Sequence, residues 1–257
     1  MTTSTLLFTL DRTVTIRATP ETVFGFFTDN TRWASWWGEG STIEPRPGGR
    51  VFIRYPGGVE ASGEVLEIEE PDRLVFTYGF MSGTPIPPGS SRVTIRLAPH
   101  KEGTHLALHH EFADEAARNE HVQGWRYQLS LFANAVANEA HAHATEAIDL
   151  WFSAWSITEE NERRSLLGRI AGDAVTFRDR FSALEGLSEL VPHIAAAQRF
   201  MPGLRLERKG PIRQCQGTAL VDWIAVSTDG QQRAAGVNVF TLSAAGRIEA
   251  VTGFWNP

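Results

Sequence analysis

The chain has 257 residues, of which 42% are hydrophobic and 21% are charged, and its formal net charge is −6. This length exceeds that of one ordinary compact domain, so we expect two domains, each able to bury a core. No apolar run is long enough to cross a bilayer and no basic cluster is visible, so the sequence argues against a membrane span and against nucleic acid as a partner.

The first residues lack the basic and apolar stretches of a secretory signal, which predicts a cytoplasmic protein. Cys215 is the single cysteine, so no internal disulfide can form, and no Cys/His spacing fits a zinc site. We therefore expect no metal and no cofactor. The 8 tryptophans and 15 phenylalanines suit either a core or the wall of an apolar cavity.

The first half begins with a strand pattern and ends with a helical one. Residues 8–17 alternate as a strand does, and a short helix at about 20–28 follows the capping residue Thr19. Turn signals then divide the chain into short strands, which predicts an antiparallel meander. From about 114 to 140, apolar residues recur at steps of three and four, so one long amphipathic helix should lie on that sheet. Its apolar face comprises Val122, Trp125, Leu129, Phe132 and Val136.

The segment 138–145 is small and polar, and it separates this pattern from a second one. We place a first domain at residues 1–140 and a second at residues 146–257. The second half starts with helical patterns, the last of them at about 187–200, and closes with strands. The predicted strands lie at about 204–214, 217–227, 234–243 and 247–255. Helices followed by a curved antiparallel sheet indicate an α+β domain.

Several segments of the first half together match one family pattern. They are 24–37 with its Trp-x-x-Trp-Trp ending, 47–52, 63–68 leading into 71–78, the turn at 103–106, and Gly124-Trp125. On these segments the first half resembles the activator-of-heat-shock-ATPase homologue branch of the START-like SRPBCC superfamily. The resemblance implies a helix-grip fold, in which the long helix closes a cavity over the sheet. It does not imply chaperone regulation, because the chaperone-binding domain of the eukaryotic activators has no counterpart here.

The second half carries a different set of cues, namely 173–179, Gly186, Gly246-Arg247-Ile248 and the final Phe254-Trp255. On these it resembles the SnoaL-like branch of the nuclear-transport-factor-two superfamily. The predicted fold class is therefore α+β throughout: a helix-grip START-like domain followed by a cone-shaped α+β barrel domain of SnoaL-like type. Such cones serve isomerisation, cyclisation, epoxide hydrolysis and plain binding, so the fold alone does not decide the activity.

Two residues carry the sharpest chemical hypothesis. The resemblance to ketosteroid isomerases puts Asp179 where that family keeps its proton-abstracting carboxylate. It puts Asn238 where the family keeps a hydrogen-bond donor to the developing oxyanion. A base and a donor facing one pocket are what enolisation requires, and an amide can donate without being held protonated. The chain departs from the pattern in its first helix, where Trp151 and Trp155 lie in the region of the family's essential tyrosine.

Further residues are candidates for lining the second pocket. Asp222 falls on one carboxylate of the epoxide-hydrolase pattern, whose other two positions are not kept. It could instead pair with an arginine such as Arg178, Arg180 or Arg213. Because side chains alternate along a strand, Asp222 and Trp223 cannot face the same side, and we expect Asp222 inside and Trp223 outside. Trp255 should face the cavity with Gly253, and His193 is a weaker candidate.

In the first domain, Trp36, Trp37 and Trp125 are candidates for core, cavity lid and ligand contacts. The favoured function is the binding of a small lipophilic or aromatic, polyketide-like molecule in one or both cavities. The alternative is an isomerase, cyclase or dehydratase that abstracts a proton in the second domain. A third hypothesis gives the second domain a role as a homodimer module, because sheets of that fold often pair.

Overall fold

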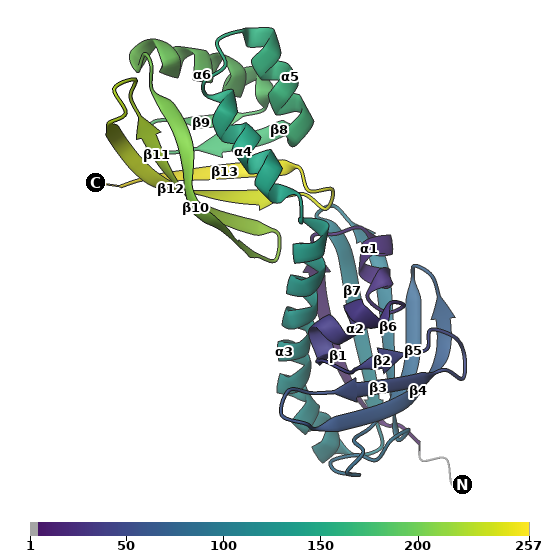
Figure 1. The fold of residues 1–257 in the computed structure, drawn as a ribbon. Helices are drawn as coiled ribbons and strands as arrows, with labels where there is room; N and C mark the ends of the chain where they lie inside the picture. Colours follow the sequence, from purple (N-terminus) through teal and green to yellow (C-terminus); the bar gives the residue numbers. More distant parts are fainter. Residues whose placement is uncertain (1–4, 257) are drawn as a thin grey trace. The chain divides into compact units, whose positions relative to one another are not determined.

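The computed structural model describes residues 5–256 (Figure 1). The chain divides into two compact units, unit 1 up to Ala137 and unit 2 from Asn138 onward. Each unit combines a large sheet with helices, so the mixed α+β class predicted from the sequence is confirmed. That each unit folds by itself stays a prediction, to be checked by expressing the two halves separately.

Unit 1 is built on a seven-stranded antiparallel sheet in the order β1-β7-β6-β5-β4-β3-β2. Its strands are β1 Phe8–Ile16, β2 Thr42–Ile43, β3 Arg50–Arg54, β4 Glu60–Glu69, β5 Arg73–Tyr78, β6 Ser91–His100 and β7 Gly103–Phe112. Its helices are α1 Pro20–Gly25, α2 Asn30–Trp37 and α3 Glu115–Ala140. The short helices start where the sequence caps them: Thr19 precedes Pro20, and the Asp29 carboxylate accepts from the Arg32 N–H at 2.9 Å.

Helix α3 packs through the apolar face that its spacing predicts. Trp125, Leu129, Phe132 and Val136 are buried, whereas Val122 is half-buried. Phe132 stacks on Phe27 with ring centroids 5.1 Å apart, and the Trp125 indole donates to the β7 residue His110. The long helix therefore closes over the sheet, as a helix-grip fold requires.

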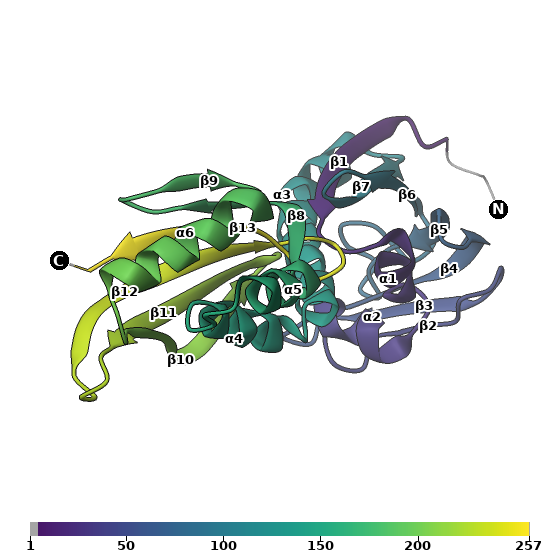
Figure 2. The ribbon, with the colours of Figure 1, turned by 90° about the horizontal axis from the view of Figure 1, so that it is seen from above.

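Unit 2 places three helices against a six-stranded sheet of order β10-β11-β12-β13-β8-β9 (Figures 1 and 2). The helices are α4 Ala144–Ala154, α5 Glu160–Ile170 and α6 Leu187–Phe200. The strands are β8 Ala171–Arg178, β9 Ala183–Glu185, β10 Arg205–Cys215, β11 Thr218–Val226, β12 Gln232–Leu242 and β13 Ile248–Trp255. The four closing strands begin and end within two residues of their predicted bounds. The sequence pattern did not predict β8 and β9, and the pairing of β13 with β8 is parallel rather than antiparallel.

The segment expected to separate the domains is not an open linker. Helix α3 runs to Ala140 and α4 begins at Ala144, so three residues form the turn. His141 within it is buried, and its Nε2 lies 2.8 Å from the Ser243 carbonyl oxygen. Small polar residues here therefore form a packed turn of unit 2.

Candidate functional site

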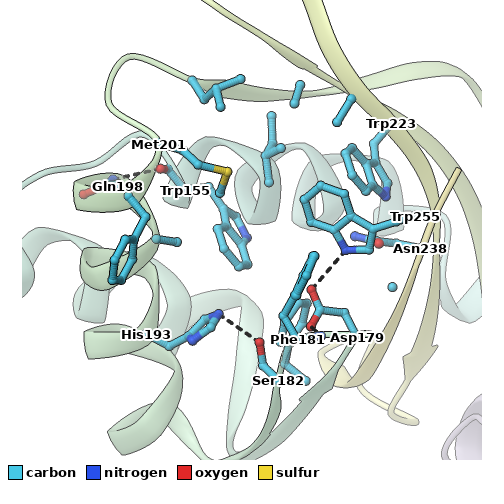
Figure 3. A pocket seen from close by; sticks show the side chains of 18 of the residues that line it. Trp155, Asp179, Phe181, Ser182, His193, Gln198, Met201, Trp223, Asn238 and Trp255 are labelled. Atoms are coloured by element: carbon cyan, nitrogen blue, oxygen red, sulfur yellow. Dashed lines mark hydrogen bonds between the residues drawn. The ribbon is translucent and has the colours of Figure 1, made fainter. Parts of the chain in front are cut away.

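Unit 2 contains a cavity of about 550 Å³ between α6, the end of α4 and the inner face of the sheet (Figure 3). Its walls are mostly aromatic and aliphatic side chains. Phe181, Phe200 and Met201 line it and are exposed, so they mark its mouth. This volume lies within the range of about 300–1,000 Å³ typical of small-molecule sites.

Asp179 and Asn238 meet at one end of this cavity, as the sequence analysis expects. Asp179 directly follows β8, and Asn238 lies in β12 directly opposite Gly253 of β13. A Cβ at Gly253 would lie 3.1 Å from Asn238 Oδ1 and 3.4 Å from the Asp179 Cβ. The absent side chain of Gly253 therefore lets the carboxylate and the amide approach each other.

The Asp179 carboxylate is held by two donors. The Phe181 N–H donates to Oδ1 at 2.9 Å, and the Trp255 indole N–H donates to Oδ2 at 3.1 Å. Each carboxylate oxygen keeps lone-pair capacity for a further proton or donor. Trp255 thus both lines the cavity and orients the carboxylate.

The register of the sheet corrects the assignment of Asp222 and Trp223. Trp223 pairs with Gly236, which pairs with Trp255, so the two indoles share the inner face. Their rings meet edge to face with centroids 5.0 Å apart, and a Cβ at Gly236 would lie 2.5 Å from the Trp223 ring. Asp222 points to the opposite side, where Arg213 pairs with it at 2.9 Å and its side chain is 45% exposed. Asp222 is therefore not a pocket residue, and Trp223 is.

The helical candidates divide in the same way. Trp155 and His193 line the cavity, with ring centroids 6.0 Å apart, and His193 Nε2 lies 3.2 Å from the Ser182 hydroxyl oxygen. Trp151 lies instead in the core of unit 2 and does not reach the cavity. Trp155 follows Trp151 by a step of four and lies just beyond the end of the helix at Ala154, so only the second ring extends past the packed layer.

Several cavity residues carry hydrogen-bonding groups that remain unused. Among the described residues, no group accepts from the indole N–H of Trp155 or Trp223, and both nitrogens are buried. The Asn238 side chain is 6% exposed and has no hydrogen-bond partner within residues 5–256. Buried donors of this kind normally find an acceptor. The cavity therefore suits a ligand that is apolar overall and carries oxygen acceptors.

Unit 1 contains a smaller cavity of about 170 Å³. Trp37 and Trp125 line it, as expected, whereas Trp36 is buried beside Phe132 and does not. Tyr55, Tyr78 and His121 also line it, although the sequence analysis did not single them out. Tyr55 lies in the loop after β3, Tyr78 is the last residue of β5 and His121 lies in α3, so no sequence spacing links them.

Within the part of the chain that the structure describes, neither unit contains a cluster of metal-ligating side chains. Across residues 5–256, no three His, Cys, Asp or Glu side chains come close enough together to hold a metal ion. In the same range, no helix is long and apolar enough to cross a membrane.

The chain was compared with curated proteins and with solved structures. No curated protein matches the chain. Similar solved structures include a SnoaL-like family protein from Agrobacterium tumefaciens, with 26% identity, 46% of this chain and 99% of that chain covered, and a TM-score of 0.42. Protein MLL2253 from Mesorhizobium loti has 24% identity, covers 49% and 94% of the two chains, and gives a TM-score of 0.44. CalU16 from Micromonospora echinospora has 26% identity, covers 51% and 76%, and gives a TM-score of 0.40.

A family model covers much of unit 1. Residues 17–137 match "Activator of Hsp90 ATPase homolog 1-like protein", which spans the helix-grip sheet and most of α3. The resemblance predicted for the first half is thereby confirmed. The chain thus contains, at residues 17–137, a domain of the Activator of Hsp90 ATPase homolog 1-like family.

Proposed function

We propose that unit 2 binds a small, largely apolar molecule, with fused or linked rings and at least one oxygen acceptor, in its 550 Å³ cavity. The observation that carries this proposal is the combination of aromatic walls with hydrogen-bonding groups that lack partners: the buried indole N–H groups of Trp155 and Trp223, and the side-chain amide of the buried residue Asn238. An oxygen on the ligand would satisfy one of these donors, and the rings would fill the apolar space.

Filling the cavity tests this proposal. Ala197 on α6 lines the cavity, whereas Ala195 on the same helix is equally half-buried and does not. Ala197→Phe should weaken binding of hydrophobic ketones and polyketide mimics at least tenfold, and Ala195→Phe should leave it unchanged. Isothermal titration calorimetry measures both. Equal affinities in the two variants would place the ligand elsewhere.

A second candidate function is proton transfer at carbon next to a carbonyl. It is favoured by the junction of Asp179 and Asn238 across Gly253. Asp179 would take a proton from the α-carbon as the C–H bond breaks and the electron pair moves onto the carbonyl oxygen. The Asn238 amide would donate to that oxygen as negative charge develops. As the carbonyl re-forms, Asp179 would return its proton to a conjugated carbon, which yields the isomer, or to the α-carbon, which regenerates the ketone.

Deuterium exchange distinguishes catalysis from binding alone. In deuterated water, wild type should exchange the α-protons of a bound hydrophobic ketone, and Asp179→Asn should not. Asp222→Asn is the matched control, because that carboxylate is paired with Arg213 on the outer face. Binding without exchange in wild type would leave the binding function and remove the catalytic one.

Two expectations from the sequence stay proposals beside this function. A homodimer through unit 2 is checked by sedimentation velocity of the full chain. A cytoplasmic location is checked by fractionation of the producing cells.

A further inference from the structure

The small cavity of unit 1 is of a size that admits one ring. Its volume is about 170 Å³, and its walls include Trp37, Tyr55, Phe80 and Trp125. An engineered protein cavity of about 150 Å³ accommodates benzene, so a single aromatic ring fits and a fused ring system does not. The ligand class of this cavity therefore differs from that of unit 2.

On the Trp125 side of the cavity, the side-chain hydrogen-bonding groups are paired with one another in a chain of donors and acceptors. The Trp125 indole N–H donates to His110 Nδ1 at 2.9 Å, so the proton of a neutral His110 is on Nε2. That Nε2–H donates to the Ser91 hydroxyl oxygen at 2.8 Å, and the Ser91 hydroxyl donates to the Tyr78 carbonyl oxygen at 2.8 Å. Burial lowers the pKa of His110 well below its ordinary value of 6.5, which keeps this chain in its neutral form. None of these atoms is left for a ligand.

His121, in contrast, has an unused acceptor. Its Nδ1 lies 2.7 Å from the Ala117 carbonyl oxygen one turn earlier in α3, so Nδ1 carries the proton and donates. Nε2 is then a bare acceptor. His121 is 9% exposed, and no described residue donates to Nε2. Burial also lowers the pKa of His121, so at neutral pH the imidazole is uncharged and accepts.

The part of the cavity wall beside His121, whose ring centroid lies 5.8 Å from that of Tyr78, supplies donors. The Tyr55 and Tyr78 hydroxyl oxygens are 2.8 Å apart, so one donates to the other and one O–H proton remains. Burial raises the pKa of Tyr55 to about 12, so the hydroxyl keeps its proton. The indole N–H of Trp37 also has no acceptor among the described residues. Glu120 is the charged lining residue, and it is exposed at the edge of the cavity rather than enclosed.

We propose that unit 1 is a binding site for a neutral, single-ring phenol-type molecule whose hydroxyl donates to His121 Nε2. The ring occupies the aromatic enclosure, and the hydroxyl oxygen faces a region that offers O–H and N–H donors. A charged ligand is disfavoured, because the enclosed groups are neutral and no counter-ion is buried with them. This inference concerns a different cavity and does not rest on the function proposed for unit 2.

Phenol and benzene test the hydroxyl contact in the full chain, because they differ by the hydroxyl group alone. Phenol should bind to unit 1 about fivefold more tightly than benzene, the factor that one net hydrogen bond of average strength supplies. His121→Phe keeps a planar ring and removes the acceptor, so it should abolish the preference for phenol while retaining benzene. The wild-type fold of the variant is checked by its melting midpoint.

Nuclear magnetic resonance places the binding event in unit 1 and does not depend on the variant folding. In wild type labelled with ¹⁵N-histidine, phenol should shift the unprotonated nitrogen of His121 in the direction of hydrogen-bond acceptance, and benzene should not. 1-Naphthol should cause no shift, because its fused rings exceed the cavity. An unshifted His121 nitrogen at saturating phenol would overturn the proposal, and so would a phenol preference that survives in His121→Phe.

Discussion

Arg163 is a fully buried arginine that has no carboxylate partner among the described residues, and it fixes the region beside the unit 2 cavity. Its guanidinium donates to the carbonyl oxygens of Ile157 at 2.8 and 3.1 Å, Thr158 at 3.0 Å and Val191 at 2.9 Å. These bonds tie the loop before α5 to α6. We expect Arg163→Met to destabilise unit 2, because methionine fills the volume of the stem but cannot donate.

The cost follows from the bonds that have no replacement. The Ile157 oxygen keeps a donor in Gln198 Nε2 at 3.0 Å, so Thr158 and Val191 are the acceptors that lose a charged donor. A hydrogen bond to a charged group contributes about 1.5–3 kcal/mol. Methionine no longer requires burial of a charge, which offsets part of the loss. Taking the low end for the two bonds, we expect a loss of about 3 kcal/mol in the free energy of unfolding.

Arg164 provides a matched control at the next position. It pairs with Glu160 at 3.5 Å on the surface, and its side chain is 46% exposed. Arg164→Met should change the free energy of unfolding by less than about 0.5 kcal/mol. A two-domain chain need not unfold in one step. The urea titrations are therefore monitored by hydrogen exchange of peptides from α5 and β11, which report on unit 2. Equal effects of the two substitutions would refute the idea that the buried guanidinium holds this region together.

Three further outcomes are expected. Trp125→Ala should lower the free energy of unfolding by about 3–5 kcal/mol, because the ring is lost and a void remains. Trp125→Phe should lower it by about 1–3 kcal/mol, because His110 Nδ1 loses its donor. An unchanged melting midpoint for Trp125→Ala would contradict the packing of α3. Burial lowers the pKa of both His110 and His121, which adjoin His109 and Glu120. Below about pH 6.5 the unfolded chain therefore binds more protons than the folded chain. In melts between pH 8 and pH 5, the stability of unit 1 should be level above that pH and fall on acidification by up to about 1.4 kcal/mol per pH unit for each histidine. Gly253→Val should abolish ketone binding in unit 2, because the valine side chain enters the space between Asp179 and Asn238. Thr252→Val, on the exposed face of the same strand, should leave binding unchanged. Equal affinities of the two variants in calorimetry would show that the ketone does not bind at that end of the cavity.

Much of the fold was predictable because local patterns and tertiary packing agree. The spacing of apolar residues in α3 marks the face that is buried, and Thr19 with Pro20 marks the start of α1. The last four strands were predictable because turn residues separate them. Strands β8 and β9 were missed because their apolar alternation is short and lies between helices.

The face of β11 that lines the cavity could not be predicted from the sequence. Alternation establishes that Asp222 and Trp223 face opposite sides, but both phases of β11 contain apolar residues, so the sequence leaves the choice open. The pairing of Trp223 with Gly236, and of Gly236 with Trp255, decides it, because the glycine makes room for the two indoles.

The sequence by itself determined the α+β class, the last four strands and the resemblance of the first half to its family, because these depend on periodicity and on motifs contiguous in the chain. Only the tertiary structure decided which side chains share a cavity. Trp223 and Trp255 are far apart in sequence and meet through strand register, and the bare nitrogen of His121 is set by the hydrogen bond that its other nitrogen makes. Register and hydrogen-bond direction arise from packing between distant segments, and no local pattern encodes them.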